Sequence, residues 1–134
     1  MKNIILMDGK EDDPVTNWTV ILIIAICLIA VDKGLTVANI KAVQKNNPNI
    51  DALSIEKNPV AKFAFQKTGL FWGTILYGLF SLGTFFFALL MFYYPAKIWA
   101  PTNAWNVSFY VMCLMYGFII FNNGYFFLRY SKLL

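Results

Sequence analysis

Three polar side chains near the end of the first apolar run are spaced to share one face of a helix. Asp32 is followed by Thr36 and then by Asn39, at intervals of four and three residues that align side chains along a helix. A carboxylate close to the bilayer must find a partner, water or a headgroup. Two interpretations follow: Asp32 faces water and pairs with a neighbouring lysine, or it forms part of an intramembrane ion or proton site.

Further polar residues are expected at the same depth. Asn122 and Asn123 interrupt a later apolar, aromatic segment, and asparagines hydrogen-bond across membrane helices with roughly 0.6 to 2 kcal/mol. Asn58 followed by Pro59 predicts a helix start with Asn58 as its cap. The position of Glu56 beside that helix start favours a role in holding the connection in place over a role as a catalytic carboxylate. The candidate polar cluster therefore comprises Asp32, Thr36, Asn39, Glu56, Asn58, Asn122 and Asn123.

The composition argues against most catalytic chemistry. The chain has no histidine, which removes the commonest metal ligand and the commonest general base. No cofactor fingerprint or metal-ligand spacing is recognisable, so we expect no catalytic, cofactor-binding or metal-binding residues and no enzyme activity. The net charge of +4 comes mainly from lysines near membrane edges and indicates topology, with no nucleic-acid partner.

The elements that must position these residues are membrane-spanning helices. Of the 134 residues 59% are apolar and 13% are charged, and the stretches Gly69–Ala96 and Ile98–Leu128 hold no charged residue at all. A spanning helix needs about 20 apolar residues. We predict an all-α integral membrane bundle, a single domain of residues 1–134 with three transmembrane helices and a short interfacial helix. The predicted segments are an acidic extracytoplasmic segment at 1–14, a helix at 15–45 that extends beyond the bilayer, a connection with the interfacial helix at 46–68, and helices at 69–95 and 104–129.

Basic residues predict the orientation of the bundle. Cytoplasmic loops near membrane crossings are enriched in Lys and Arg. Lys97 is alone in the second connection, whereas Arg129 and Lys132 follow the last helix. The chain is therefore expected to be a multi-pass protein of the cell membrane with its amino terminus outside and its carboxy terminus in the cytoplasm. The first connection holds Lys33, Lys41, Lys45, Lys57, Lys62 and Lys67.

Small and aromatic residues predict contacts with other helices. Four glycines of the second crossing, at spacings that include small-xxx-small, are expected to let helices approach closely. The many phenylalanines exceed what three helices can bury against each other, which favours a subunit of a larger assembly. The predicted packing glycines are Gly69, Gly73, Gly78 and Gly83.

The polar pattern resembles a family of small three-helix prokaryotic membrane proteins of unknown function. In that family an Asp followed by a Thr late in the first helix precedes Glu-x-Asn-Pro and an interfacial stretch that ends in Gly. The resemblance implies the three-helix architecture and the importance of the polar cluster, and it assigns no reaction. Residue usage rich in Asn, Lys and Ile suits an archaeal source. The matching residues are Asp32, Thr36, Glu56, Asn58, Pro59 and Gly69.

Three functions are open at this stage. The leading hypothesis is a non-catalytic accessory subunit that holds larger integral membrane subunits in the lipid bilayer, with a membrane-bound oxidase or monooxygenase of the ammonia or methane type as a concrete host. The alternative is a small homo-oligomeric channel or transporter that uses the polar cluster. A membrane enzyme is the third, and it requires Asp32 and Glu56 to face one cavity.

Overall fold

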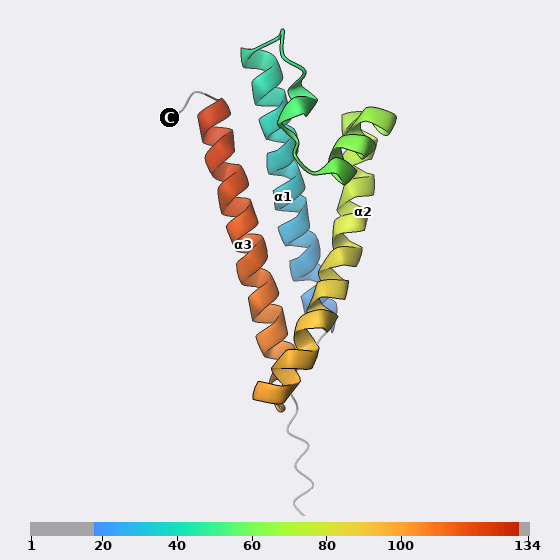
Figure 1. Cartoon of the computed structure of the whole chain (residues 1–134), viewed down its shortest axis with the longest axis vertical. Coiled ribbons are helices and arrows are strands. Elements are labelled where there is room, and N and C mark those ends of the chain that lie inside the picture. The colour runs from blue at the N-terminus through green and yellow to red at the C-terminus, as the bar shows by residue number, and fades with distance from the viewer. Residues whose placement is uncertain (1–17, 132–134) are drawn as a thin grey trace, which may run out of the picture.

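The computed structural model describes residues 18–131 and is built of helices (Figure 1). Three helices are long and apolar enough to cross a membrane, and the described residues include no strand. The predicted all-α class and the three long apolar helices are therefore confirmed. The elements in order are α1 (Trp18–Asn46), the short 3-10 helix η1 (Ala52–Ile55), α2 (Pro59–Trp99) and α3 (Ala104–Tyr130).

Helix α1 continues well past the apolar run from which it was predicted. Its 29 residues span roughly 44 Å, longer than a hydrocarbon core of about 30 Å. The helix passes Asp32 without a break and ends at Asn46, just before Asn47 and Pro48, because proline disfavours helical angles in the residue that precedes it. The expected segment 1–14 and the expected helical residues 15–17 lie outside the described residues.

Helix α2 is interrupted by one glycine near its start. Gly69 has φ 78° and ψ 173°, a backbone conformation that is essentially restricted to glycine. The break separates a first segment, Pro59–Thr68, from the long apolar segment that follows. A straight helix of 41 residues would measure roughly 60 Å, far more than a bilayer core. This first segment is helical where the sequence predicts a short interfacial helix, and its place at a membrane interface stays a prediction.

Helix α2 continues past Pro95, the residue at which the sequence predicts that the second crossing ends. Helix α2 runs through Pro95 to Trp99, although proline removes one helical donor. The last turn keeps its closing bond, because the Ala100 N–H donates to the Ala96 carbonyl at 2.8 Å. Aromatic packing joins α2 to α3 at the same end of the bundle, where the rings of Tyr93 and Trp105 stack with centroids 4.0 Å apart.

Two of the four predicted packing glycines have a role within α2. Gly69 permits the break in α2. At Gly73 an added Cβ would lie 2.7 Å from Phe65 Cδ1 and 2.9 Å from the Phe65 backbone, so this glycine lets the first segment of α2 fold back against the second. A Cβ at Gly78 or Gly83 would meet nothing within 4 Å. Contacts between the three helices therefore do not depend on these four residues.

The three helices meet at one end and spread toward the other. Figure 1 shows α2 and α3 converging at the end where they connect to each other, while the α1–α2 connection and the last turn of α3 lie at the opposite end. The converging half contains an apolar core with contributions from all three helices. Its buried members are Ile21, Ala25, Ile29, Phe85, Leu89, Phe109 and Met112.

A second apolar cluster holds the α1–α2 connection against the spread end of the bundle. Ile40 and Val43 of α1 pack with Ala52 of η1 and with Ala61 and Phe65 of α2. Helix η1 begins where the Asp51 side chain accepts the Leu53 N–H, which is a helix cap. Along α1, one apolar cluster ends at Ile29 and the other begins at Ile40. The stretch of α1 between them carries the polar residues.

Candidate functional site

A buried ion pair lies at the centre of the polar stretch of α1. Asp32 and Lys33 are 3% and 6% exposed, and Lys33 Nζ lies 2.6 Å from Asp32 Oδ2. The same ammonium lies 3.7 Å from the centroid of the Tyr77 ring of α2, where the electron-rich ring face attracts a cation. Each charge is therefore compensated inside the chain, which a low-dielectric environment requires.

Two asparagines join this ion pair to α3. Asn123 Nδ2 donates to Asp32 Oδ1 at 2.6 Å, and Asn39 Nδ2 donates to the Asn123 carbonyl at 3.2 Å. The acceptors fix both amide orientations, since an amide oxygen turned toward a carboxylate or a carbonyl would be repelled. The side-chain oxygens of both asparagines are consequently directed away from these bonds. Asn39 Oδ1 is buried and has no hydrogen-bond partner.

A second set of hydrogen bonds fastens the connection to α2. The Asn58 side-chain oxygen accepts the N–H groups of Val60 and Ala61, as predicted for a helix cap, and its Nδ2 donates to the Tyr77 hydroxyl at 2.7 Å. Glu56 Oε1 accepts the Asn58 N–H at 2.8 Å. Because Tyr77 also covers the Lys33 ammonium, the hydrogen bonds that fasten the connection and the buried ion pair both involve this one aromatic side chain.

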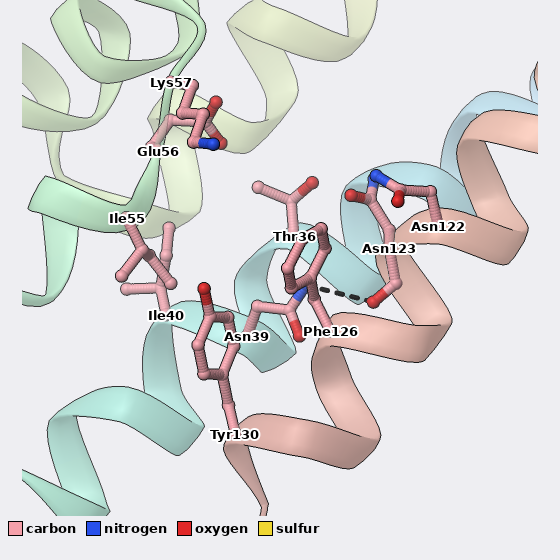
Figure 2. Close-up of a pocket in the computed structure, with 10 residues that line it drawn as sticks. All are labelled: Thr36, Asn39, Ile40, Ile55, Glu56, Lys57, Asn122, Asn123, Phe126 and Tyr130. Carbon is pink, nitrogen blue, oxygen red and sulfur yellow. Dashed lines mark hydrogen bonds between the residues drawn. The ribbon is translucent and has the colours of Figure 1, made fainter.

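A cavity of about 250 Å³ opens between α1, α3 and the connection. Figure 2 shows the side chains of α1 and α3 on one side of it, with Glu56 and Lys57 of the connection facing them. Thr36 forms part of the α1 wall, and its hydroxyl donates to the Asp32 carbonyl at 3.1 Å. The lining residues are Thr36, Asn39, Ile40, Ile55, Glu56, Lys57, Asn122, Asn123, Phe126 and Tyr130.

The structure brings most of the predicted polar cluster to this cavity and leaves two members outside it. Asp32 lies behind the wall and reaches it through its bond from Asn123. Asn58 belongs to the hydrogen bonds that fasten the connection to α2. Asp32 and Glu56 therefore do not line the same cavity. Acid–base chemistry by a pair of carboxylates would need both of them to face one cavity. The predicted members in the lining are Thr36, Asn39, Glu56, Asn122 and Asn123.

Several residues of the site were not singled out from the sequence. A neighbouring lysine was one expected partner of Asp32, but Lys33 was not named as that lysine, and the structure pairs the two away from water. Tyr77, Phe126 and Tyr130 were indistinguishable from the many other aromatic residues, because only the fold decides which rings reach the polar stretch. Lys57 carried no signal beyond its charge.

The site offers hydrogen bonding and charge but no metal-ligand set. Among residues 18–131, no group of three or more Cys, Asp or Glu side chains is placed to hold a metal ion. Comparison with protein-family models, curated proteins and solved structures found no match to this chain. The fold and the site therefore define a class: a bundle of three helices long and apolar enough to cross a membrane, with a buried ion pair and a polar cavity near one end.

Proposed function

We propose that the protein is a non-catalytic accessory subunit of a larger integral membrane complex. The observation that carries this proposal is an unfilled apolar groove of about 490 Å³ between α1 and α2. The groove is open at the outer surface of the bundle, so in a membrane it is filled either by lipid chains or by a helix of another subunit. A transmembrane helix of another subunit is the occupant that we propose.

The walls of the groove suit the approach of another helix. Ala30 and Gly34 line it from α1, and Thr74 and Gly78 line it from α2. Both pairs have the four-residue spacing of small residues with which membrane helices approach closely. A Cβ at Gly34 or Gly78 would meet nothing within 4 Å. The chain therefore leaves these small residues free for contact with a partner.

The same geometry gives less support to a channel or transporter formed by one copy. The polar cavity lies at the spread end, and in the converging half the helices pack around the nearly fully buried Phe85 and Leu89. Asp32 and Lys33 also neutralise each other, which leaves neither charge free to carry an ion. A pathway would have to form between several copies.

The proposed setting is the cell membrane, with the amino terminus outside and the connection and carboxy terminus in the cytoplasm. Figure 1 places the connection and the last turn of α3 at the same end, and the excess of lysine in the connection favours the cytoplasmic side for that end. In this orientation the first segment of α2, with Lys62, Lys67 and the 62% exposed Phe63, lies at the inner membrane interface. A membrane-bound oxidase or monooxygenase is the host that we propose.

Substitution of Gly78 by Leu tests the proposal. A Cβ at Gly78 would meet nothing within 4 Å and the rest of the side chain would enter the open groove, so we expect unchanged folding and at least a tenfold loss of larger polypeptides that co-purify from the native membrane in mild detergent. Gly83→Leu is the matched control, because Gly83 is also open to its surroundings on α2 but does not line the groove.

The outcomes separate the two functions. Loss of a larger polypeptide in Gly78→Leu and its retention in Gly83→Leu support the accessory subunit. Equal retention in both variants contradicts a partner helix in the groove. Purification of a symmetric homo-oligomer without other chains contradicts the proposal and favours the channel or transporter.

A further inference from the structure

We propose that the polar cavity between α1, α3 and the connection binds the primary ammonium group of an organic amine. This ligand site goes beyond the role of an accessory subunit and does not depend on it. The cavity is lined by side chains from three separate parts of the chain, as Figure 2 shows. Its acceptors, its unpaired carboxylate and its aromatic wall each favour a cation that carries N–H groups.

The amide groups in the wall offer oxygen to a ligand. Asn39 Nδ2 donates one of its two N–H groups to the Asn123 carbonyl, and Asn123 Nδ2 donates one of its two to Asp32, whereas neither side-chain oxygen accepts a hydrogen bond from residues 18–131 and both are free to accept. Asn39 is 7% exposed and its Oδ1 has no donor. A buried acceptor without a donor costs about 1–3 kcal/mol, so Asn39 Oδ1, which protein atoms cover in this structure, would gain from a ligand N–H that reached it.

The carboxylate of Glu56 has no cationic partner among residues 18–131. The buried Asp32–Lys33 contact is an ion pair, whereas Glu56 has one bond, from the Asn58 N–H to Oε1. Its second oxygen is therefore open to a ligand. Lys57 is exposed at the rim, where water screens its charge. The half-buried Glu56 thus supplies the stronger local field for a cation inside the cavity.

Two aromatic rings and the size of the cavity complete the match. Phe126 and Tyr130 line the cavity and stack with their centroids 5.9 Å apart, and aromatic faces attract ammonium groups. The volume of about 250 Å³ equals roughly eight water molecules at about 30 Å³ each. It admits a small amine or a lipid headgroup amine. A quaternary ammonium would satisfy the rings but would bring no N–H to the asparagines.

Nuclear magnetic resonance of the full chain in phosphatidylcholine nanodiscs tests the site. The side-chain amide signals of Asn39 and Asn123 are followed during titration with methylammonium, and the amide of Asn106, at the other end of α3, serves as an internal reference. We expect saturable shifts of Asn39 and Asn123 without a shift of Asn106. Tetramethylammonium is expected to bind at least tenfold more weakly.

Glu56→Gln is the decisive variant, because Gln keeps one oxygen for the Asn58 N–H while it removes the charge and replaces the second oxygen by an NH2 donor. We expect at least a tenfold weaker affinity for methylammonium and an unchanged circular dichroism spectrum. Lys57→Gln is the matched control, with equal or tighter binding. The proposal is overturned if Glu56→Gln binds as tightly as the wild type, or if tetramethylammonium, sodium or acetate produces the same shifts at the same concentrations as methylammonium. Absence of saturable shifts up to molar methylammonium overturns it as well.

Two further arms identify the source of the amine. Free ethanolamine is titrated into the phosphatidylcholine nanodiscs, and phosphatidylethanolamine is introduced as a lipid component in separate nanodiscs. Shifts in both arms, or in either one, support the ammonium site and show whether the group comes from solution or from a headgroup. Failure in both arms contradicts it. The proposed accessory role is unaffected by this result, because it is read from co-purification.

Discussion

At the scale of single residues, the central feature is a buried charge pair in the middle of α1. Asp32 and Lys33 each have a compensating group inside the chain, and Tyr77 covers the ammonium. Removal of one partner of a buried pair costs more than removal of both, because the remaining charge keeps its desolvation penalty without its attraction. The interior of this bundle therefore depends on both charges together.

Asp32→Asn is expected to lower the free energy of unfolding by about 3–5 kcal/mol. Asn still offers an oxygen to Asn123, but it leaves the 6% exposed Lys33 without its counter-charge. The double variant Asp32→Asn/Lys33→Met is expected to be more stable than Asp32→Asn alone. The measurement is denaturant unfolding in detergent micelles, followed by circular dichroism.

The control for this experiment is Lys67→Met, which removes an exposed lysine and should change stability by no more than about 0.5 kcal/mol. Equal losses in Asp32→Asn and Lys67→Met would mean that Asp32 and Lys33 are solvated in the protein as it exists in micelles.

The polar cluster shows what residue spacing can and cannot predict. The interval from Asp32 to Thr36 and Asn39 was sufficient to predict one helical face, because a helix repeats every 3.6 residues or so. The partner of Asp32 could not be fixed in this way, because a lysine one position away in a helix points in a different direction unless tertiary packing turns both side chains together. Burial under Tyr77 provides that packing.

At the scale of elements, the start and the break of α2 are set by its first ten residues and by the glycine that follows them. Asn58 and Pro59 start the helix, as the sequence predicted, and Gly69 breaks it. Phe65 then packs against the backbone at Gly73. The sequence pattern could not distinguish a glycine that bends one helix from a glycine that packs two helices, because both roles use the same four-residue spacing.

Gly69→Ala is expected to destabilise the protein by about 1–3 kcal/mol, because an L side chain is strained at φ 78° and ψ near 180°. The matched substitution Gly83→Ala lies in regular helix with open space around it and should stabilise by about 0.5–1 kcal/mol. Unfolding in micelles measures both. Equal effects of the two substitutions would contradict a break at Gly69.

Asn58→Ala is expected to cost about 1–2 kcal/mol, because it removes a helix cap and the hydrogen bond to Tyr77. Tyr77→Phe removes only the hydroxyl and should cost about 0.5–1.5 kcal/mol. The loss in the double variant should be smaller than the sum of the two single losses, because both variants lack the same bond. Strict additivity in the unfolding measurements would mean that the Asn58–Tyr77 bond is absent.

At the scale of the whole molecule, the fold class and the three long apolar helices followed from hydropathy, because a lipid environment leaves helices as one of few ways to satisfy the backbone. The spread of the bundle and the groove between α1 and α2 did not follow, since helix packing depends on which side chains meet. The cavity at the spread end likewise required the tertiary structure, because η1 and Glu56 reach it only through the fold of the connection.

Opposite membrane sides are expected for the two connections. In a variant with Cys27→Ser and Cys113→Ser, a membrane-impermeant maleimide should label Asn103→Cys on intact cells and Lys57→Cys only after lysis. The reason is the lysine excess of the first connection, which favours the cytoplasm. Labelling of Lys57→Cys on intact cells would indicate the reverse orientation, in which the cavity opens to the outside.

Native mass spectrometry of the protein extracted from its own membrane in mild detergent tests the accessory role most directly. The groove between α1 and α2 lacks a side chain from this chain to fill it, and we expect a fixed stoichiometric complex with at least one larger membrane polypeptide. A spectrum that contains only this chain, as a monomer or as a symmetric homo-oligomer, would contradict the accessory subunit.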